Sequence, residues 1–335
     1  MGNKSYNILL TCSGGGLTPY LINSLKKSNR HKNLKILSVD YKENAIGKYF
    51  SDFFEQVPYG KSRKYITKIL YLCKKYKIHL VIPTSDEEAV NISKNREKFE
   101  KKNIKITCVD HKILKIFSNK ILTYKSLTEL NFTLPSWSGV NNHDEFKKEI
   151  SKFLKKNRKF VIKPASSRGS RKVKIINPKG VLKNKKKFLD LLSNEYKNSY
   201  PLIISSMLRN PVYDLDLLAW KGKLITAVTR RRLIPEDPNG GHIVEKNKKI
   251  INLGKKIVKH FNLSWLYDCD FMLDNKQNPI LIEINPRMSG SASVSIEAGV
   301  PLFEDLISLA MNKKIPKHKI PKKQKIISFK NLSKI

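Results

Sequence analysis

The first third of the chain alternates short apolar runs with segments of helical period. The apolar runs predict buried strands over residues 7–11, 35–39, 79–83 and 104–109. Residues 65–76 carry apolar side chains three and four positions apart, which predicts an amphipathic helix, and a glycine turn leads into a helix over 20–27. Strands and helices in alternation predict a doubly wound parallel sheet, so we expect one α/β domain over residues 1–112.

The remainder of the chain is richer in hairpins. Residues 113–130 have a helical pattern, and residues 250–261 have an amphipathic one. Between these helices, strand-like runs separated by polar turns occur at residues 160–164, 172–176, 202–207, 212–220 and 224–229. Strands that follow one another in this way predict antiparallel sheets and an α+β organisation.

A hairpin late in the chain carries two acidic residues on one face. Its strands are Cys269–Leu273 and Ile280–Ile284, joined by a polar turn. If the turn is symmetric, Asp270 lies opposite Glu283, and Asn285 points to the same side. Facing carboxylates raise each other's pKa unless a cation lies between them, and Mg²⁺ prefers such oxygen ligands. The hairpin predicts a magnesium site, although an exposed, solvated hairpin would show the same short pattern.

Two basic segments offer ligands for an anion. The strand that contains Lys163 is followed by the small polar loop 165–171 and a returning strand, a flap whose N–H and hydroxyl groups suit phosphates. The hairpin over 212–229 ends in three arginines, and alternation places Arg230 and Arg232 on one face. Each segment alone is equally typical of a solvated surface in so basic a chain.

The composition is that of a globular protein with an unusual charge. The 335 residues are 40% hydrophobic and 28% charged, and 66 basic residues against 28 acidic ones give a net charge of +38. Because the lysines are spread over every segment without a nucleic-acid-binding motif, a solvated surface is favoured over specific nucleic-acid binding. The basic tail over residues 316–335 is broken by an Ile-Pro pair, and we expect it to pack loosely.

The sequence shows no pattern typical of a disulfide framework, a zinc site, a membrane span or a secretory signal. Four cysteines without a Cys-x-x-Cys pair fit reduced thiols in a cytoplasmic protein. No apolar run reaches the length of a membrane span, and the apolar stretch that follows Met1 is too short for a secretory signal. We therefore expect a cytoplasmic protein without membrane association.

Five segments, taken in order, resemble the ATP-grasp superfamily and especially stand-alone proteins similar to the ATP-binding halves of carbamoyl-phosphate synthase. The segments are PTSDEEAV (83–90), NKILTYKSL (119–127), VIKPASSRGSRKVKI (161–175), VYDLDLLAWKGK (212–223) and CDFML…ILIEINPRMSGS (269–291). The resemblance implies an ATP-grasp fold with a Rossmann-like pre-ATP-grasp domain over 1–112. It further implies a small subdomain with the phosphate loop over 113–200 and a C-terminal subdomain with the Mg²⁺ site over 201–315.

The resemblance also implies ligands for the nucleotide and the metal. Lys120 and Lys163 match the two lysines that hold the ATP phosphates. The ligands of Mg²⁺, or of Mn²⁺ in its place, match Asp270, Glu283 and Asn285. The loop that covers the phosphates matches Ser166, Ser167, Arg168, Gly169, Ser170 and Arg171.

Further residues match the adenine site and the acceptor site. Adenine would be contacted by main-chain groups near Ser206, Met207 and Leu208. The arginines that line the acceptor and γ-phosphate site match Arg287, Arg230 and Arg232. The chain departs from the family pattern at Ser206 and Val212, where glutamates usually contact the adenosine.

The implied reaction is an ATP-dependent ligation. A small anionic carboxylate substrate takes the γ-phosphoryl group of ATP as an acyl phosphate, and an amine displaces the phosphate. Two alternatives stay open. One is carboxyphosphate formation from bicarbonate, as in carbamoyl-phosphate synthase, and the other is a catalytically degraded protein that binds nucleotides or polyanions. The sequence leaves the substrates undefined and a homodimer open.

Overall fold

The computed structural model describes residues 5–166, 172–179, 181, 184–319 and 321–329. The chain forms two compact units. The first contains Met1–Leu114, Tyr213–Asp270 and Asn285–Ile335, and the second contains Lys115–Val212 and Phe271–Ile284. The boundaries that the sequence suggests near residues 112, 200 and 315 stay predictions.

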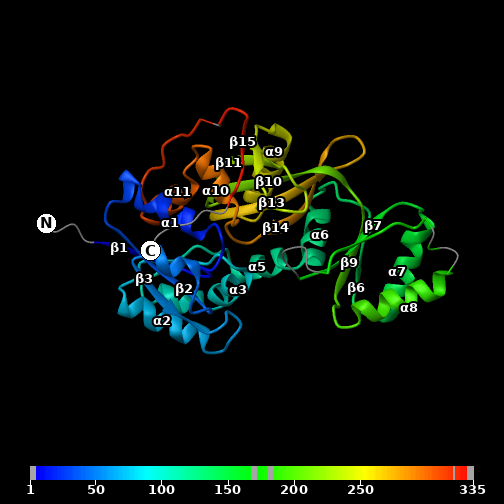
Figure 1. Ribbon diagram of the computed structural model, residues 1–335, viewed down its shortest axis with the longest axis horizontal. Coiled ribbons are helices and arrows are strands. Elements are labelled where there is room, and N and C mark those ends of the chain that lie inside the picture. Colours follow the sequence, from blue (N-terminus) through cyan, green and yellow to red (C-terminus); the bar gives the residue numbers. More distant parts are fainter. Residues whose placement is uncertain (1–4, 167–171, 180, 182–183, 320, 330–335) are drawn as a thin grey trace. The chain divides into compact units, whose positions relative to one another are not determined.

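A five-stranded parallel sheet opens the first unit, with the strands in the order β3-β2-β1-β4-β5. Figure 1 labels three of its strands, β1, β2 and β3. In the central strand, Ile8, Leu9 and Leu10 are buried, as expected where helices cover both faces of a parallel sheet. The prediction of a parallel sheet at the start of the chain is confirmed. Its strands are β1 (Tyr6–Leu10), β2 (Leu34–Asp40), β3 (Phe53–Gln56), β4 (Leu80–Ile82) and β5 (Lys105–Ile106).

The helices of this part follow the apolar spacing of the sequence. Helix α2 (Tyr65–Lys75) buries Tyr65, Ile69 and Leu72 on one face. Ser85 lies at the N-cap of α3, but its hydroxyl donates to the carboxylate of Glu88, 2.8 Å away. The other helices here are α1 (Thr18–Lys26), η1 (Asn29–His31), η2 (Ile46–Tyr49), α3 (Asp86–Lys94), α4 (Arg96–Glu100) and α5 (His111–Phe117).

A second sheet has six strands in the order β14-β13-β10-β11-β12-β15. The neighbours β10, β11, β12 and β15 pair antiparallel. Helix α9 lies against this sheet through Gly254, because a Cβ there would come within 2.6 Å of Leu215. The strands are β10 (Arg209–Trp220), β11 (Lys223–Arg232), β12 (His242–Val244), β13 (Trp265–Leu273), β14 (Pro279–Asn285) and β15 (Gln324–Ile326). The later helices are α9 (Lys248–His260), α10 (Ala292–Glu297) and α11 (Leu302–Ala310).

The second unit is built on a four-stranded antiparallel sheet in the order β6-β9-β7-β8. Phe146 and Ile150 of α7 and Leu192 of α8 pack with the strands in one apolar core. The strands are β6 (Trp137–Val140), β7 (Phe160–Pro164), β8 (Lys174–Ile176) and β9 (Leu202–Ser206), and the helices are α6 (Lys120–Glu129), α7 (His143–Lys155) and α8 (Lys185–Tyr196).

The structure differs from the sequence prediction at two places. The helix expected over 113–130 is broken, because the side chain of Asn119 accepts hydrogen bonds from the N–H groups of Ile121 and Leu122 and starts α6 as a new helix. The basic tail was expected to pack loosely, but β15 pairs with β12 and forms the last strand of the six-stranded sheet.

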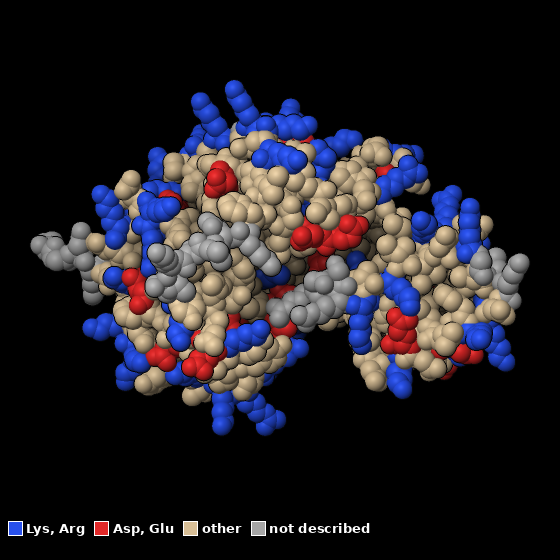
Figure 2. Space-filling model, in the orientation of Figure 1, with Lys and Arg blue, Asp and Glu red and all other residues tan. Residues whose placement is uncertain are grey.

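The face of the molecule drawn in Figure 2 carries many basic residues without gathering them in one place. Figure 2 shows lysine and arginine side chains spread over the drawn face, with acidic side chains among them. Among the residues described, no helix combines the length and the apolar character that crossing a bilayer requires.

Candidate functional site

Lys120 is held at the start of α6 with little access to solvent. The Asn119 cap fixes the first turn of the helix, and the backbone N–H of Lys120 donates to the carbonyl of Ala165 at 2.8 Å. The side chain is buried, and its Nζ lies 3.0 Å from Oε1 of Glu283 on β14. The structure thus brings a predicted phosphate ligand and a predicted metal ligand into one ion pair.

Lys163 lies on β7, where alternation keeps Phe160, Ile162 and Pro164 buried and leaves Lys163 half-buried. Its Nζ stands over the ring of Tyr124, 5.9 Å from the ring centre. Burial raises the pKa of Tyr124 well above its ordinary value, so the phenol stays neutral, and its hydroxyl donates to the carbonyl of Ile282 on β14. Helix α6 therefore links both predicted phosphate lysines to β14.

A cavity of about 680 Å³ opens beside the segment predicted to contact adenine. The main-chain N–H of Ser206 donates to Ser136 and that of Met207 to Lys159, both within the second unit. These bonds fix the path of the segment between β9 and β10. The cavity is lined by Arg158, Lys159, Ser206, Met207, Leu208, Arg209, Asn210 and Asn275.

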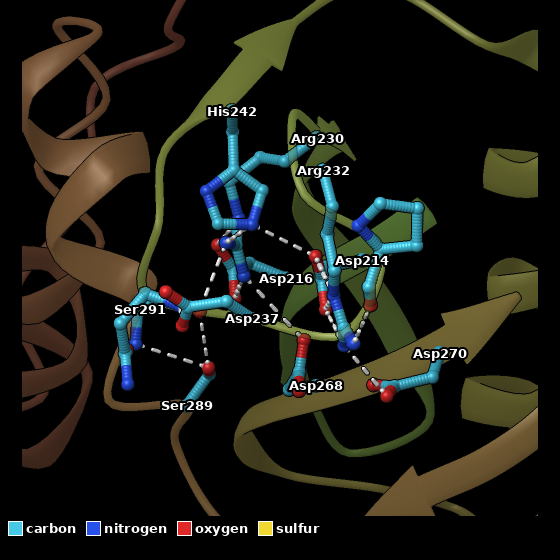
Figure 3. Close-up of polar contacts among 12 residues, drawn as sticks. Asp214, Asp216, Arg230, Arg232, Asp237, His242, Asp268, Asp270, Ser289 and Ser291 are labelled. Carbon is cyan, nitrogen blue, oxygen red and sulfur yellow. Dashed lines mark hydrogen bonds and ion pairs between the residues drawn. The ribbon is translucent and has the colours of Figure 1, made fainter. Parts of the chain in front are cut away.

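Four strands of the six-stranded sheet place charged side chains together in the first unit (Figure 3). Alternation along each strand directs every second side chain to the same face, so positions two apart contribute together. We call the group the arginine–aspartate cluster. Its members are Asp214 and Asp216 of β10, Arg230 and Arg232 of β11, His242 of β12, and Asp268 and Asp270 of β13.

Arg232 connects two aspartates of the cluster. Its Nε lies 3.0 Å from Oδ2 of Asp214, and its Nη2 lies 2.8 Å from Oδ2 of Asp270 (Figure 3). Asp270 was predicted as a metal ligand and Arg232 as an anion ligand, so here too the structure pairs one with the other. Asp214, Asp268 and Asp270 also each offer an oxygen within 4.8 Å of the others, a spacing that a cation could bridge.

Arg230 is fully enclosed and acts as a hub. Its guanidinium donates to Asp216 at 2.8 and 3.0 Å and to the hydroxyl of Ser291 at 3.0 Å. The hydroxyl of Ser291 in turn lies 2.8 Å from that of Ser289. Arg230 has no exposed surface, and its contacts support a role in holding the segment around Ser291. The direct substrate contact expected from the sequence stays a prediction.

Burial and neighbouring charges oppose each other in this cluster. Burial acts to raise the pKa of Asp214, but the hydrogen bond from His242 and the charges of Arg230 and Arg232 outweigh it and hold that pKa well below its usual range. Burial lowers the pKa of His242, despite its bond to Asp214. The imidazole is therefore neutral at neutral pH, and the two arginines supply the compensating positive charge.

Asp268 has a different environment from Asp214. Burial raises its pKa well above the usual range, and the charges of Asp270, Asp214 and Asp216 act in the same direction. Its Oδ2 accepts a hydrogen bond from Nδ2 of Asn285 at 2.9 Å, while Oδ1 has no hydrogen-bond partner among the residues that the structure describes. In this contact Oδ2 is the acceptor, and Oδ1 lies 3.5 Å from Nη2 of Arg230.

Arg287 lies two residues after Asn285, where β14 ends, and its side chain contacts α3 of the first unit. Its Nε donates to Oδ1 of Asp86 at 3.0 Å, in the first turn of α3. One of its Nη groups donates to the carbonyl of Met288. The pair ties the segment after β14 to the motif at residues 83–90 within the first unit.

Comparison with known proteins identifies the fold. A family model described as "ATP-grasp in the biosynthetic pathway with Ter operon" matches residues 198–335, and one described as "PylC-like, N-terminal domain" matches residues 8–107. Carboxyaminoimidazole ribonucleotide synthase of Aspergillus clavatus, solved with ATP, superposes with a TM-score of 0.75 at 15% identity, over 96% of this chain and 80% of that one. The chain has the ATP-grasp fold.

Two further solved structures are similar at low identity. The biotin carboxylase domain of the Hydrogenobacter thermophilus 2-oxoglutarate carboxylase, solved with MgADP, ADP and bicarbonate, gives a TM-score of 0.71 at 17% identity, covering 94% of this chain and 72% of that one. An L-amino acid ligase of Bacillus licheniformis gives 0.68 at 12% identity, covering 92% and 75%. At these identities the comparison establishes the shared fold.

One curated sequence is also related to the chain. The uncharacterized protein MJ0776 of Methanocaldococcus jannaschii is 26% identical over 234 residues, which are 67% of this chain and 55% of that protein. The match thus spans little more than half the length of that relative.

The predicted site residues of the ATP-grasp fold are gathered to different degrees. Lys120 lies with Glu283, and Asp270 lies with Asn285, whose Nδ2 is 3.4 Å from Oδ1 of Asp270. Ser166 is exposed after β7. The loop residues Ser167, Arg168, Gly169, Ser170 and Arg171 lie outside the described part of the chain.

Sequence inspection missed four members of the arginine–aspartate cluster. Asp214, Asp216, Asp268 and His242 are all buried, although charged residues are rarely enclosed. A signal was present, because acids alternate with apolar residues in Asp214-Leu-Asp216 and in Asp268-Cys-Asp270, as the arginines do on β11. Where every second residue of one strand is acidic and every second residue of a neighbouring strand is basic, the pattern predicts buried ion pairs such as those of the arginine–aspartate cluster.

Proposed function

We propose that the chain is an ATP- and Mg²⁺-dependent ligase that joins a small carboxylate substrate to an amine through an acyl phosphate. ATP-grasp proteins are typically ATP-dependent carboxylate–amine ligases, which supports the proposal at the level of reaction class. The observation that carries it is the ion pair between Lys120 and Glu283. It joins the residue that matches a phosphate ligand to one that matches a metal ligand, as a site for a metal-bound triphosphate needs.

The residues of the second unit suit the nucleotide. Lys120 and Lys163 would bind phosphate oxygens as point charges, and Lys120 is already fixed in place by its helix cap. The exposed hydroxyl of Ser166 would add a donor at the start of the phosphate loop. The cavity beside Ser206, Met207 and Leu208 is large enough for a purine base, which supports adenine binding by this segment.

The donor set fits Mg²⁺. Two carboxylates and one amide oxygen are hard ligands, which this ion prefers over nitrogen or sulfur. Asn285 turns its Nδ2 to Asp268 and Asp270, so its carbonyl oxygen faces away from them and is available as a ligand. Bound by Asp270, Glu283 and Asn285, the ion would neutralise charge on the β- and γ-phosphates.

Catalysis in this proposal is positioning and charge compensation. The lysines orient the triphosphate, and Arg232 and Arg287 offer guanidinium groups for the carboxylate substrate and the transferred phosphoryl group. The carboxylate oxygen attacks the γ-phosphorus, ADP leaves, and the amine nitrogen then attacks the acyl carbon with loss of phosphate and a proton. No side chain has to become a covalent nucleophile.

We include in this proposal the resemblance of the sequence motifs to the ATP-binding halves of carbamoyl-phosphate synthase. A second candidate reaction, carboxyphosphate formation from bicarbonate, is supported by the similarity to a biotin carboxylase solved with bicarbonate. The cytoplasmic location and the homodimer likewise stay predictions.

The test measures ADP formation by the purified chain with MgATP and a panel of carboxylates and amines. Turnover that requires both co-substrates is the expected result, and Glu283→Gln is expected to abolish it, because the change removes a metal ligand at constant volume. Glu129→Gln, a change of equal charge at an exposed position of α6, is the control.

Other outcomes discriminate between the alternatives. Turnover with bicarbonate and ammonia alone would favour carboxyphosphate chemistry. Nucleotide binding that needs no Mg²⁺ and is lost at high salt, without turnover, would favour a polyanion-binding protein. Full activity of Glu283→Gln would refute the metal assignment.

A further inference from the structure

Asn285 makes its two side-chain contacts with carboxylates. Its Nδ2 is 2.9 Å from Oδ2 of Asp268 and 3.4 Å from Oδ1 of Asp270. An amide presents one donor end and one acceptor end, whereas a carboxyl oxygen that carries no proton only accepts. Two carboxylate neighbours therefore select one of the two amide orientations, with Nδ2 toward them and Oδ1 away.

Asp268 provides the shorter of these contacts and is placed to do so. It is buried on β13, two residues before Asp270, and its contact with Arg230 is long, at 3.5 Å. Arg230 already donates two hydrogen bonds, of 2.8 and 3.0 Å, to Asp216. The nearest polar partner of Asp268 is thus Asn285, not the enclosed arginine.

The alternative contact, with Asp270 alone, would leave the amide poorly fixed. The 3.4 Å distance to Asp270 is at the long end of the hydrogen-bond range, and Oδ2 of Asp270 is occupied by Arg232. If Asp270 also turns to a metal, its hold on Nδ2 weakens further. Asp268 is then the group that keeps the amide oriented.

We propose that Asp268 is a positioning residue, which holds the amide of Asn285 so that its carbonyl oxygen, and not its NH₂ group, is presented to the metal. The inference rests on the proposed function, because it concerns the same Mg²⁺ site. Groups that orient a metal ligand through its second polar atom typically change metal affinity by about 10- to 100-fold when they are altered. In this role Asp268 acts on the metal through Asn285 and is not itself a ligand.

The test exchanges the donor and the acceptor of this pair. In Asp268→Asn, the new amide has a single acceptor end. With that oxygen toward Asn285, its NH₂ group would face Nη2 of Arg230, donor against donor, because this nitrogen lies 3.5 Å from Oδ1 of Asp268. The opposite orientation turns the new NH₂ group toward Asn285 and rotates the NH₂ of Asn285 into the metal position. In the double variant D268N/N285D, the new amide donates to one carboxylate oxygen of residue 285 and leaves the other for the metal. The double variant keeps the net charge of the wild-type chain.

The readout is Mn²⁺ binding, followed by electron paramagnetic resonance with a non-hydrolysable ATP analogue present. D268N is expected to bind Mn²⁺ at least about tenfold more weakly than the wild type, and D268N/N285D is expected to recover to within about threefold. Asp52→Asn, which makes the same charge change at the parallel sheet, is the control and should bind as the wild type does. Circular dichroism and a urea titration confirm folding of each variant.

Each outcome has a defined meaning. Wild-type affinity in D268N, or a double variant no better than the single one, would overturn the positioning role and leave the proposed function intact. A wild-type chain that binds no Mn²⁺ with the nucleotide would overturn both. If D268N does not fold, Asp268→Ser, whose hydroxyl is too short to reach Nδ2, is measured in its place with the same expected loss.

Discussion

The Nζ of Lys120 lies 3.0 Å from Oε1 of Glu283, so the lysine predicted to bind phosphate compensates the carboxylate predicted to bind metal. Replacing Lys120 by Met should weaken binding of MgATP by about tenfold or more, because a charge-assisted hydrogen bond contributes about 1.5–3 kcal/mol. Calorimetry with a non-hydrolysable analogue measures the change. Lys125→Met, at an exposed position of the same helix, should bind as the wild type does; equal affinities in both variants would exclude Lys120 from the nucleotide site.

The enclosed Arg230 should matter greatly for stability. Arg230→Met leaves Asp216 and Asp268 without their cation, and removing one partner of a buried ion pair costs about 3–5 kcal/mol. Urea unfolding of the two variants Arg230→Met and Arg231→Met makes the comparison. Arg231 pairs with Glu245 near the surface, with 30% of its side chain exposed, so its loss should cost less than about 1 kcal/mol. Similar midpoints would show that Arg230 is not a structural hub.

We expect the contribution of Glu88 to the free energy of unfolding to fall with rising pH, whereas that of most acidic residues rises. Burial raises its pKa above 4.5, although the hydroxyls of Thr11 and Ser85 donate to it. As the pH rises from 4.5 to the folded pKa, the unfolded chain releases this proton first, so the contribution of Glu88 to stability falls with rising pH.

The variant Glu88→Gln should remove this contribution. The free energy of unfolding of the wild type minus that of the variant should then decrease between pH 4.5 and pH 7. Urea titrations at several pH values measure it, with the exposed Glu97→Gln as the control for lost charge. A difference that is constant or grows with pH would contradict the assignment.

The pairing of β12 with β15 depends on Gly241. Its φ of +108° is strained for other residues, and a Cβ there would lie 2.9 Å from the carbonyl oxygen of Ile326. Gly241→Ala should therefore destabilise the chain by about 1–3 kcal/mol and raise hydrogen exchange in β15. Gly16→Ala, where a Cβ meets no described atom within 4 Å, should cost much less. Unchanged exchange at residues 324–326 would show that Gly241 does not limit this pairing.

The sequence predicted the helices and strands better than the contacts between them. Period and turn chemistry are local, so the parallel sheet and the hairpins at 212–229 and 269–284 could be inferred from neighbouring residues. The break at Asn119 was also written locally, in a residue that caps helices well, but the apolar pattern on both sides concealed it.

Local sequence patterns do not reveal which side chains far apart in the sequence come into contact. That Lys120 meets Glu283, and that Arg232 meets both Asp214 and Asp270, depends on strand order, which the sequence did not specify. The enclosure of Arg230 could not be inferred either, because the desolvation of a charge depends on every element packed around it. The resemblance to family motifs predicted the site residues without revealing their contacts with one another.

The pairing of β15 with β12 also bears on synthesis of the chain. Strand β12 carries His242 of the arginine–aspartate cluster, and its outer edge is closed by residues 324–326. During translation, the strands from β10 to β14 emerge from the ribosome well before this last strand. The nascent chain therefore exposes an open strand edge next to the ionic layer until residue 326 has emerged, and that interval is when a chaperone or a second nascent chain can pair with it.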